Sequence, residues 1–321
     1  MSKSKEKADE IIKAIGDGES VEEIKNRFVS TPTEWFNYSA KAYSISLKKA
    51  VKERNIDVKK QHVSATGNEI IDEMLSINDH LANYALSIPI TATLSTLENV
   101  KSLLNGLPST ESDMLQLIGR ITMNPMFRAR QKKGRLEVFP HFNNFVSIVD
   151  AALLSYYRKN YIGCYLTLIP LIEGIIIRWM GYEFGKPKPK FEEIRKFFKN
   201  SHKRQPCPGN ILFHNIFVKV ADKILNNHLY KPSTTGRAYS NFNRHVASHL
   251  LNDDLFATEE NCIRLFMLLD LMTEIFLYES KINDPRFNLK DADLMPEVNI
   301  LIEVMYHSDQ NSAEQKILIN E

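Results

Sequence analysis

The segment that organises the predicted fold is Tyr161-Ile-Gly-Cys-Tyr-Leu-Thr-Leu-Ile-Pro-Leu-Ile-Glu-Gly-Ile-Ile-Ile177. Apolar residues fall on nearly every side of a helix built from residues 160–182, which is typical of a helix buried at the centre of a helical protein. A membrane-spanning helix needs about 20 mostly apolar residues. Because Glu173 and Arg178 interrupt the segment, we expect a core helix and no membrane span.

Helix signals continue on both sides of this segment. Glycine is scarce, and no sustained alternation typical of strands is present. Ser20–Glu23 and Thr31–Glu34 have the pattern of capping boxes, and Thr258 is expected to cap the helix that begins with Glu259 and Glu260. We therefore predict an all-α protein, with helices at about 34–54, 66–76, 78–104, 110–123, 142–159, 160–182, 191–199, 210–229 and 259–278.

The composition limits the class of protein. The chain has 321 residues, 43% of them hydrophobic, so it can bury a sizeable core. Its formal net charge of +2 gives no global basic field for nucleic acid. The three cysteines, Cys164, Cys207 and Cys262, are widely spaced and form no CxxC pair, which excludes zinc ribbons and disulfide frameworks. The charged N-terminus has no apolar signal core. We expect a cytoplasmic protein.

A basic stretch is predicted to connect two helical regions. No acidic residue occurs between Asp113 and Glu137, and Asn124-Pro125 and Gly134 interrupt regular structure. We interpret residues 124–140 as the connection between an N-terminal helical region (1–135) and a C-terminal domain (142–282), which is followed by a tail (283–321). Two interpretations of the stretch are open. It is either a solvated connection or a strip that binds nucleic-acid phosphates through Arg128, Arg130, Lys132 and Lys133.

The densest polar cluster is Tyr239-Ser-Asn-Phe-Asn-Arg-His-Val-Ala-Ser-His-Leu-Leu251. Arg244 carries a permanent, forked positive charge that suits phosphate. His249 can exchange a proton near neutral pH. Together these groups are sufficient to cleave RNA without a metal, because the imidazole can act as acid or base and the guanidinium can stabilise the transition state.

Spacing alone leaves other interpretations of this cluster open. His245 and His249 are four residues apart and could bind a metal as a pair, although no third ligand is evident nearby. Arg244 and His249 lie about 140° apart on an ideal helix, so they converge only if the arginine reaches round or the helix is distorted. The cluster could equally be a simple helix start with Asn243 as its cap.

The wider context of the cluster resembles a known family. Asn243-Arg244-His245-x-x-x-His249, the following Thr258-Glu-Glu-Asn-Cys-Ile-Arg-Leu-Phe-Met-Leu-Leu-Asp270 and the upstream Leu171-Ile-Glu-Gly174 are similar to segments of bacterial HEPN domains (higher eukaryotes and prokaryotes nucleotide-binding). The resemblance covers about 142–282. Residues 1–135 resemble no family known to us. Leu250-Leu251 follow His249 where many HEPN relatives have glycine.

The resemblance implies a bundle of four to five helices and, in many members, a metal-independent endoribonuclease that needs no cofactor. Arg244 and His249 would be catalytic, with His245 assisting. Asn243 would orient or cap the motif. Glu173 would hold Arg244 or a histidine, or it would be a core residue satisfied by Arg178 or a backbone amide.

The resemblance also implies partners. RNA would be the substrate, and two copies of the chain would form a homodimer whose motifs share one cleft. The HEPN group is linked with toxin–antitoxin and anti-phage defence systems, which implies an antitoxin or a trigger protein. The alternative function is a non-catalytic HEPN module that binds nucleotide or RNA, or a toxin–antitoxin partner. In a third hypothesis, residues 1–135 act as a sensor that controls the C-terminal domain.

Overall fold

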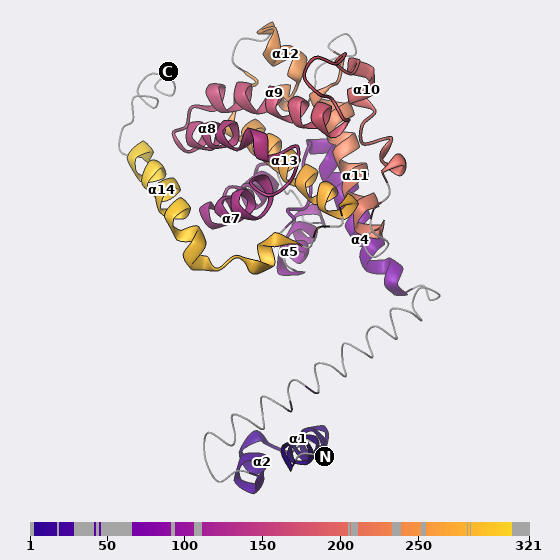
Figure 1. Ribbon diagram of the computed structural model, residues 1–321, viewed down its shortest axis with the longest axis vertical. Coiled ribbons are helices and arrows are strands. Elements are labelled where there is room, and N and C mark those ends of the chain that lie inside the picture. The colour runs from indigo at the N-terminus through magenta and orange to yellow at the C-terminus, as the bar shows by residue number, and fades with distance from the viewer. Residues whose placement is uncertain are drawn as a thin grey trace. The chain divides into compact units, whose positions relative to one another are not determined.

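Every regular element in the described part of the chain is a helix, as predicted (Figure 1). The computed structural model describes residues 3–17, 19–28, 42, 45, 66–90, 94–105, 111–204, 206, 211–232, 239–251, 255–280, 282 and 284–309. The chain divides into an N-terminal unit, Met1–Ile71, and a larger unit, Asp72–Glu321. The predicted helix at 34–54 and the predicted cap at Thr31–Glu34 lie outside the described residues, except that Ala42 and Ile45 are helical.

The N-terminal unit contains α1 (Lys3–Gly16) and α2 (Val21–Phe28). The predicted capping box starts α2: the Glu23 N–H donates to Ser20 Oγ at 3.3 Å, and the Ser20 N–H donates to Glu23 Oε2 at 3.0 Å. A small apolar core holds the unit together, formed by Ala8, Ile11, Ala14, Ile24 and Ala42.

From Thr66 onward, long helices alternate with short 3₁₀ and π helices, which are labelled η. In order they are α4 (Thr66–Leu81), η1 (Ala82–Tyr84), α5 (Leu94–Asn105), α6 (Glu111–Thr122), α7 (Pro125–Gln131), η2 (Lys132–Leu136), η3 (Asn143–Phe145), α8 (Val146–Tyr157), α9 (Tyr161–Trp179), α10 (Phe191–Arg195), η4 (Ser201–Lys203), α11 (Ile211–Ile224), η6 (Leu225–Leu229), η8 (Tyr239–Asn241), α12 (Arg244–Ser248), α13 (Glu259–Glu279), η9 (Pro285–Asn288) and α14 (Asp291–Asp309).

Two apolar helices form the centre of the larger unit. Figure 1 shows α13 among α7, α8, α9 and α11, and every residue of α13 from Asn261 to Leu277 is buried. Thr258 caps this helix as predicted, because its side chain accepts a hydrogen bond from the Asn261 N–H. Helix α9 packs against both α8 and α13. The core of the larger unit is therefore built around the apolar helix α9 and the buried helix α13, which also carries the buried polar residues Arg264, Asp270 and Glu274.

Helix α9 is the one described helix that is long and apolar enough to cross a membrane. Within its most apolar 18-residue window, 56% is buried inside the protein. Ten of its residues are buried, Glu173 among them. Packing in the core accounts for the apolar composition of α9, as the interruption by Glu173 and Arg178 indicated.

The predicted continuous helix at 78–104 is interrupted in the structure. Helix α4 ends at Leu81, Ala85 has a left-handed φ of 56°, and α5 begins only at Leu94. Pro89 explains the interruption, because proline has no N–H and disfavours helical backbone at the preceding residue. The Ile88 N–H is satisfied by the Asn78 side chain at 2.9 Å.

The structure divides the chain at residue 71, whereas the basic stretch suggested a division near residue 135. Helix α6 packs on α13, and η1 packs on α11. At Gly119 of α6 a Cβ atom would lie 2.9 Å from Ile263 Cδ1, so the two helices approach closely. Residues 72–135 therefore share one core with the C-terminal helices.

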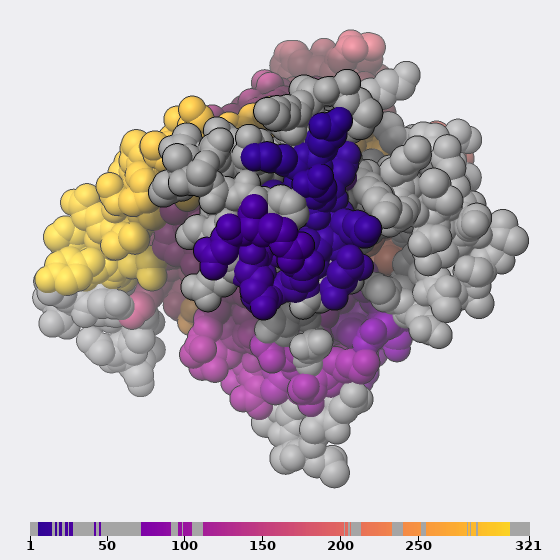
Figure 2. Space-filling model, turned by 90° about the horizontal axis from the view of Figure 1, so that it is seen from below, coloured from indigo at the N-terminus to yellow at the C-terminus, as the bar shows by residue number. Residues whose placement is uncertain are grey.

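The segment predicted as a C-terminal tail contains a packed helix. Leu294 and Val298 of α14 pack on Ala129 of α7, and Leu301 joins the main core. The outer side of α14, yellow in Figure 2, exposes Met295, Ile300, Ile302 and Tyr306. Residues 310–321 lie outside the described residues.

Candidate functional site

The polar cluster at Asn243–His249 forms the short helix α12. Asn243 caps it: Oδ1 accepts from the His245 N–H at 2.8 Å and from the Val246 N–H at 3.1 Å. The amide nitrogen of Asn243 donates to the Lys231 carbonyl at 2.7 Å and to the His228 carbonyl at 3.3 Å. The Asn243 side chain therefore fixes both the start of α12 and its position beside the end of η6.

Arg244 is held by a carboxylate of the core helix α9. Its Nε donates to Glu173 Oε2 at 3.0 Å, and its guanidinium lies 5.1 Å from the centre of the Phe191 ring. Glu173 is 8% exposed and also lies 3.5 Å from Lys188 Nζ. Of the alternatives considered for Glu173, the structure shows the contact with Arg244.

The terminal nitrogens of Arg244 remain available to a ligand. Only Nε is used by Glu173, and the two Nη groups have no hydrogen-bond partner among the described residues. The side chain is 29% exposed, so these donors can reach a group that arrives from solvent. A guanidinium oriented at Nε and open at both Nη groups can bind two phosphate oxygens.

His245 and His249 form a ring pair on the exposed side of α12. Their ring centroids are 4.6 Å apart, and their planes are inclined at 64°. Both side chains are exposed. Helix α12 ends at Ser248, and His249 is its C-cap. Two imidazoles at this distance can serve as a proton acceptor and a proton donor for one reacting group.

A cavity of about 260 Å³ lies beside Arg244 and His245. It is lined by Phe191, Glu192, Arg195, Leu229, Tyr230, Lys231, Pro232, Arg244 and His245. His249 is outside this lining and contacts the cavity residue His245. The structure thus brings Arg244 and His245 into one cavity, with His249 adjacent to it.

Tyr230 lines the cavity, and its hydroxyl is fully buried. It is 4% exposed, and its hydroxyl has no hydrogen-bond partner among the described residues. Burial, reinforced by the negative charge of Glu173, raises the pKa of the Tyr230 phenol, so the hydroxyl keeps its proton. An unpaired buried hydroxyl is costly unless a ligand or water completes it.

No sequence pattern singles out Phe191 or Tyr230. Phe191 begins an amphipathic helix, and Tyr230 precedes a loop that starts with Lys231-Pro232. Neither residue belongs to a motif. Their roles follow from contacts: the Phe191 ring lies against both Arg244 and Tyr230, with 5.1 Å between the two ring centroids. Only the folded arrangement identifies them.

The four basic residues of the expected phosphate strip all have carboxylate partners within the chain. Arg128 pairs with Asp270. Lys132 contacts Asp150 at 2.9 Å and Glu297 at 2.8 Å. The other two pairs are Arg130–Asp291 and Lys133–Glu137, each at 2.8 Å. A phosphate at this stretch would have to compete with these carboxylates.

The stretch is also not a solvated connection. It forms α7 and the π helix η2, in which Arg128, Gln131 and Arg135 are buried. Arg135 Nη2 donates to Glu274 and to Asp284, each at 2.9 Å. The acidic partners come from residues that are 139–149 positions later in the chain. The composition of residues 124–140 alone therefore suggests a net positive charge that distant carboxylates neutralise in the folded chain.

Metal ligands do not gather at the site in the described part of the chain. No group of three or more His, Cys, Asp or Glu side chains with the geometry of a metal site occurs among the described residues. Cys164 and Cys262 are buried free thiols, and burial raises the pKa of the Cys262 thiol. Cys207 lies outside the described residues.

Comparisons of the chain with known protein families, with curated proteins and with solved structures found no match. The site is therefore interpreted from its own geometry. That geometry defines an oriented arginine, two adjacent exposed histidines, and a small cavity with an aromatic wall.

Proposed function

We propose that the chain is a metal-independent endoribonuclease of the HEPN type, with a HEPN-like helical bundle in residues 142–282. The observation that supports it most directly is the pair of imidazoles, His245 and His249, next to an arginine whose Nε is fixed by Glu173. An acid, a base and a phosphate-binding cation are the groups that RNA transesterification requires. No cofactor is required for this reaction.

The proposed reaction uses each group once. One imidazole accepts the proton of the ribose 2′-hydroxyl while O2′ forms a bond to phosphorus. The bond from phosphorus to O5′ then breaks, and the second imidazole protonates O5′. The Nη groups of Arg244 stabilise the charge on the non-bridging oxygens. The products are a 2′,3′-cyclic phosphate and a 5′-hydroxyl.

The cavity residues suit the nucleotide next to the reacting phosphate. The Phe191 ring is 39% exposed and offers a stacking surface for a base. The Tyr230 ring, whose centroid is 5.1 Å from that of Phe191, extends the aromatic wall of the cavity. We further propose that the enzyme acts in the cytoplasm as a homodimer formed through residues 142–282, in a toxin or anti-phage defence role, controlled by an antitoxin or a trigger protein.

RNA cleavage in the presence of EDTA tests the proposal. Wild type is expected to release 2′,3′-cyclic phosphate ends. Arg244→Ala, His245→Ala and His249→Ala are each expected to lower the rate by about 10²–10³-fold. Lys188→Ala is the matched control, because Lys188 contacts Glu173 but lines no part of the cavity. Full activity in the Arg244 or His249 variant would refute these assignments, and loss of wild-type activity in EDTA would point to a metal.

A non-catalytic HEPN module that binds nucleotide or RNA is the second candidate. It is favoured by the cavity itself, in which Phe191, Tyr230 and Arg244 could hold a nucleotide without cleaving it. Expression in a bacterial host separates the two functions. Growth arrest that is relieved by His249→Ala supports the nuclease, whereas harmless expression together with RNA binding supports the binding module.

A further inference from the structure

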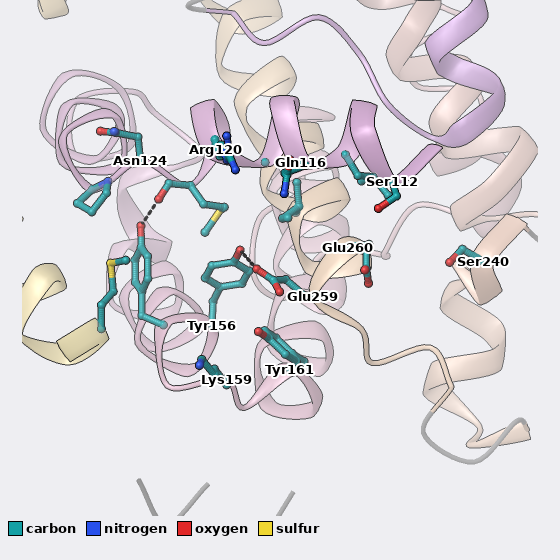
Figure 3. Close-up of a pocket in the computed structure, with 17 residues that line it drawn as sticks. Ser112, Gln116, Arg120, Asn124, Tyr156, Lys159, Tyr161, Ser240, Glu259 and Glu260 are labelled. Atoms are coloured by element: carbon teal, nitrogen blue, oxygen red, sulfur yellow. Dashed lines mark hydrogen bonds between the residues drawn. The ribbon is translucent and has the colours of Figure 1, made fainter. Parts of the chain in front are cut away.

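A second and larger cavity lies on the side of the larger unit formed by α6 and by the connection between α8 and α9 (Figure 3). Its volume is about 890 Å³, within the range of ligand sites in proteins. Figure 3 shows Ser112, Gln116 and Arg120 along α6 on one wall and Tyr156 and Tyr161 on the other. We refer to this cavity as the α6 trough. None of the residues in the proposed ribonuclease site lines it.

The α6 wall offers a row of hydrogen-bonding groups. Ser112, Gln116 and Arg120 are four residues apart, so they share one helix face. All three are exposed and have no hydrogen bond or ion pair with described residues. The row spans about 12 Å along the helix axis, since each residue rises about 1.5 Å. That length matches about four residues of an extended peptide chain.

The start of α13 supplies two carboxylates to the trough. Glu259 Oε1 accepts a hydrogen bond from the Tyr156 hydroxyl at 2.9 Å. Burial, reinforced by the Glu259 charge, raises the pKa of Tyr156 and Tyr161, so both phenols stay protonated beside it. Glu260 is exposed and has no ion-pair partner among the described residues. The trough therefore presents two cations, Arg120 and Lys159, and two carboxylates, of which Glu259 is oriented by Tyr156.

Mixed charge decides which ligand fits. A polyphosphate or RNA strand would be repelled by Glu259 and Glu260, and a polyamine would be repelled by Arg120 and Lys159. A chain that carries both a cationic and an anionic group complements the mixed charge of the lining. Ser112 and Gln116, on the same helix face as Arg120, can pair with the backbone amides of such a chain. Leu115, Met123 and Ile263 provide an apolar surface for a side chain.

We propose that the α6 trough binds an extended peptide segment of a partner protein. The segment carries a basic side chain that pairs with Glu259 and Glu260, and a carboxylate that pairs with Arg120. This binding does not depend on the proposed ribonuclease activity.

The trough is connected to α12 by a short strained segment. Ser240 lines the trough, and its carbonyl accepts a hydrogen bond from the buried Asn261 amide at 2.8 Å. Ser240 and Asn241 have left-handed φ angles of 50° and 55°, a conformation that costs energy in residues other than glycine. Arg244 follows three residues later. A peptide that contacts Ser240 would therefore change the protection of the α12 amides.

Charged peptide libraries provide the binding test. Four libraries of fluorescein-labelled hexapeptides are compared, each with four randomised central positions. Two libraries carry Lys at one end and Asp at the other, in opposite orders. The third carries Lys at both ends, and the fourth carries Asp at both ends. Fluorescence anisotropy with the full chain is expected to show at least tenfold tighter binding of one mixed-charge library. Arg120→Glu is expected to remove that preference, and Arg120→Glu combined with Glu260→Arg is expected to favour the opposite charge order.

The control variant is Arg158→Glu, an exposed arginine between α8 and α9 that does not line the trough. It should bind the peptides as wild type does. Equal binding of all four libraries, or a preference unchanged by Arg120→Glu, would overturn the proposal. So would tighter binding of adenosine monophosphate or spermidine. Hydrogen exchange at residues 239–249 with the preferred library tests the connection, and unchanged exchange there would refute it.

Discussion

Arginines of the α7–η2 region and Arg244 of α12 occupy opposite environments. Arg128 and Arg135 are 4% and 0% exposed. The first faces Asp270, and the second faces Glu274 and Asp284. Arg244 has a side chain that is 29% exposed, and it donates to Glu173 through Nε. The buried arginines face carboxylates inside the protein and are closed to a ligand from solvent, whereas Arg244 keeps donors that such a ligand can reach.

We expect the buried ion pairs to contribute mainly to the stability of the fold and Arg244 to contribute mainly to the reaction. A buried ion pair that loses one member leaves an uncompensated charge, which destabilises the fold strongly. Substitution of a partly exposed arginine lowers the stability only slightly, but it removes the donors that bind phosphate. Each of the following experiments tests one side of the comparison.

The largest expected effect is on the free energy of unfolding when Asp270 is removed. Asp270→Ala leaves Arg128 buried without its carboxylate and also removes the hydrogen bond that Gln131 donates to Asp270 at 3.1 Å. We expect a loss of about 3–5 kcal/mol in urea unfolding. The double variant Arg128→Met/Asp270→Leu is expected to recover most of that loss. A single variant no less stable than the double one would contradict the ion-pair interpretation.

Arg244→Ala is expected to change activity and leave stability nearly intact. The rate of RNA cleavage should fall by about 10²–10³-fold, which corresponds to about 2.7–4 kcal/mol of transition-state stabilisation. The free energy of unfolding should change by less than about 1 kcal/mol, because the pair with Glu173 is partly exposed. Glu173→Gln should give a smaller loss of rate, because it keeps an acceptor for Arg244. A large loss of stability in Arg244→Ala would remove the distinction between the two regions.

A buried histidine, His228, is expected to make the stability of the chain depend on pH. Burial, opposed by the hydrogen bond to the Ala82 carbonyl and reinforced by Arg264 and Lys231, lowers the pKa of His228. The unfolded chain therefore binds more protons below about pH 6.5 than the folded chain. Stability should fall as pH decreases from 7 to 5, by at most about 1.4 kcal/mol per pH unit for this group.

Urea midpoints between pH 5 and pH 8 measure this effect. His228→Gln should flatten the dependence, and the slope that remains should include His141, whose pKa is lowered by burial and by Arg178. Equal slopes for wild type and His228→Gln would refute the role of His228.

The smallest expected effect concerns Leu250, directly after the histidine pair. It has a left-handed φ of 49° and is 66% exposed. Left-handed backbone costs a non-glycine residue about 1–2 kcal/mol, and a glycine at this position would avoid that cost. Part of the benefit is lost because glycine also increases the conformational entropy of the unfolded chain. Leu250→Gly should therefore stabilise the chain by about 0.5–1 kcal/mol. Leu251→Gly, at a position without positive φ, should not stabilise it.

Local rules predicted local structure well. Ser20 with Glu23, Asn243 and Thr258 all cap helices as their sequence context indicated. These interactions join residues within one helical turn, where residue type and spacing are sufficient. The central helix at 160–182 was predicted for the same reason, because its composition alone requires burial on all sides.

Long-range pairing could not be predicted from spacing. The basic stretch at 124–140 was predicted to carry unpaired positive charge. Its carboxylate partners come from α13, from Asp284 before η9 and from α14, which lie far along the chain. The boundary near residue 135 depended on that reading. Helix α14 was missed because its core-facing residues, Leu294, Val298 and Leu301, sit among acidic and exposed apolar positions. Phe191 and Tyr230 acquire meaning only from their contact with Arg244.

Asn243 gives the site an unusual genetic constraint. Its side chain uses all four of its hydrogen-bonding positions, two as acceptor and two as donor, while it is 2% exposed. Aspartate has the same shape but no donors, and glutamine has the same groups but one more methylene. Serine has only one donor. No other side chain reproduces the full set at this length, so every substitution at position 243 is expected to leave at least one buried backbone group without its partner.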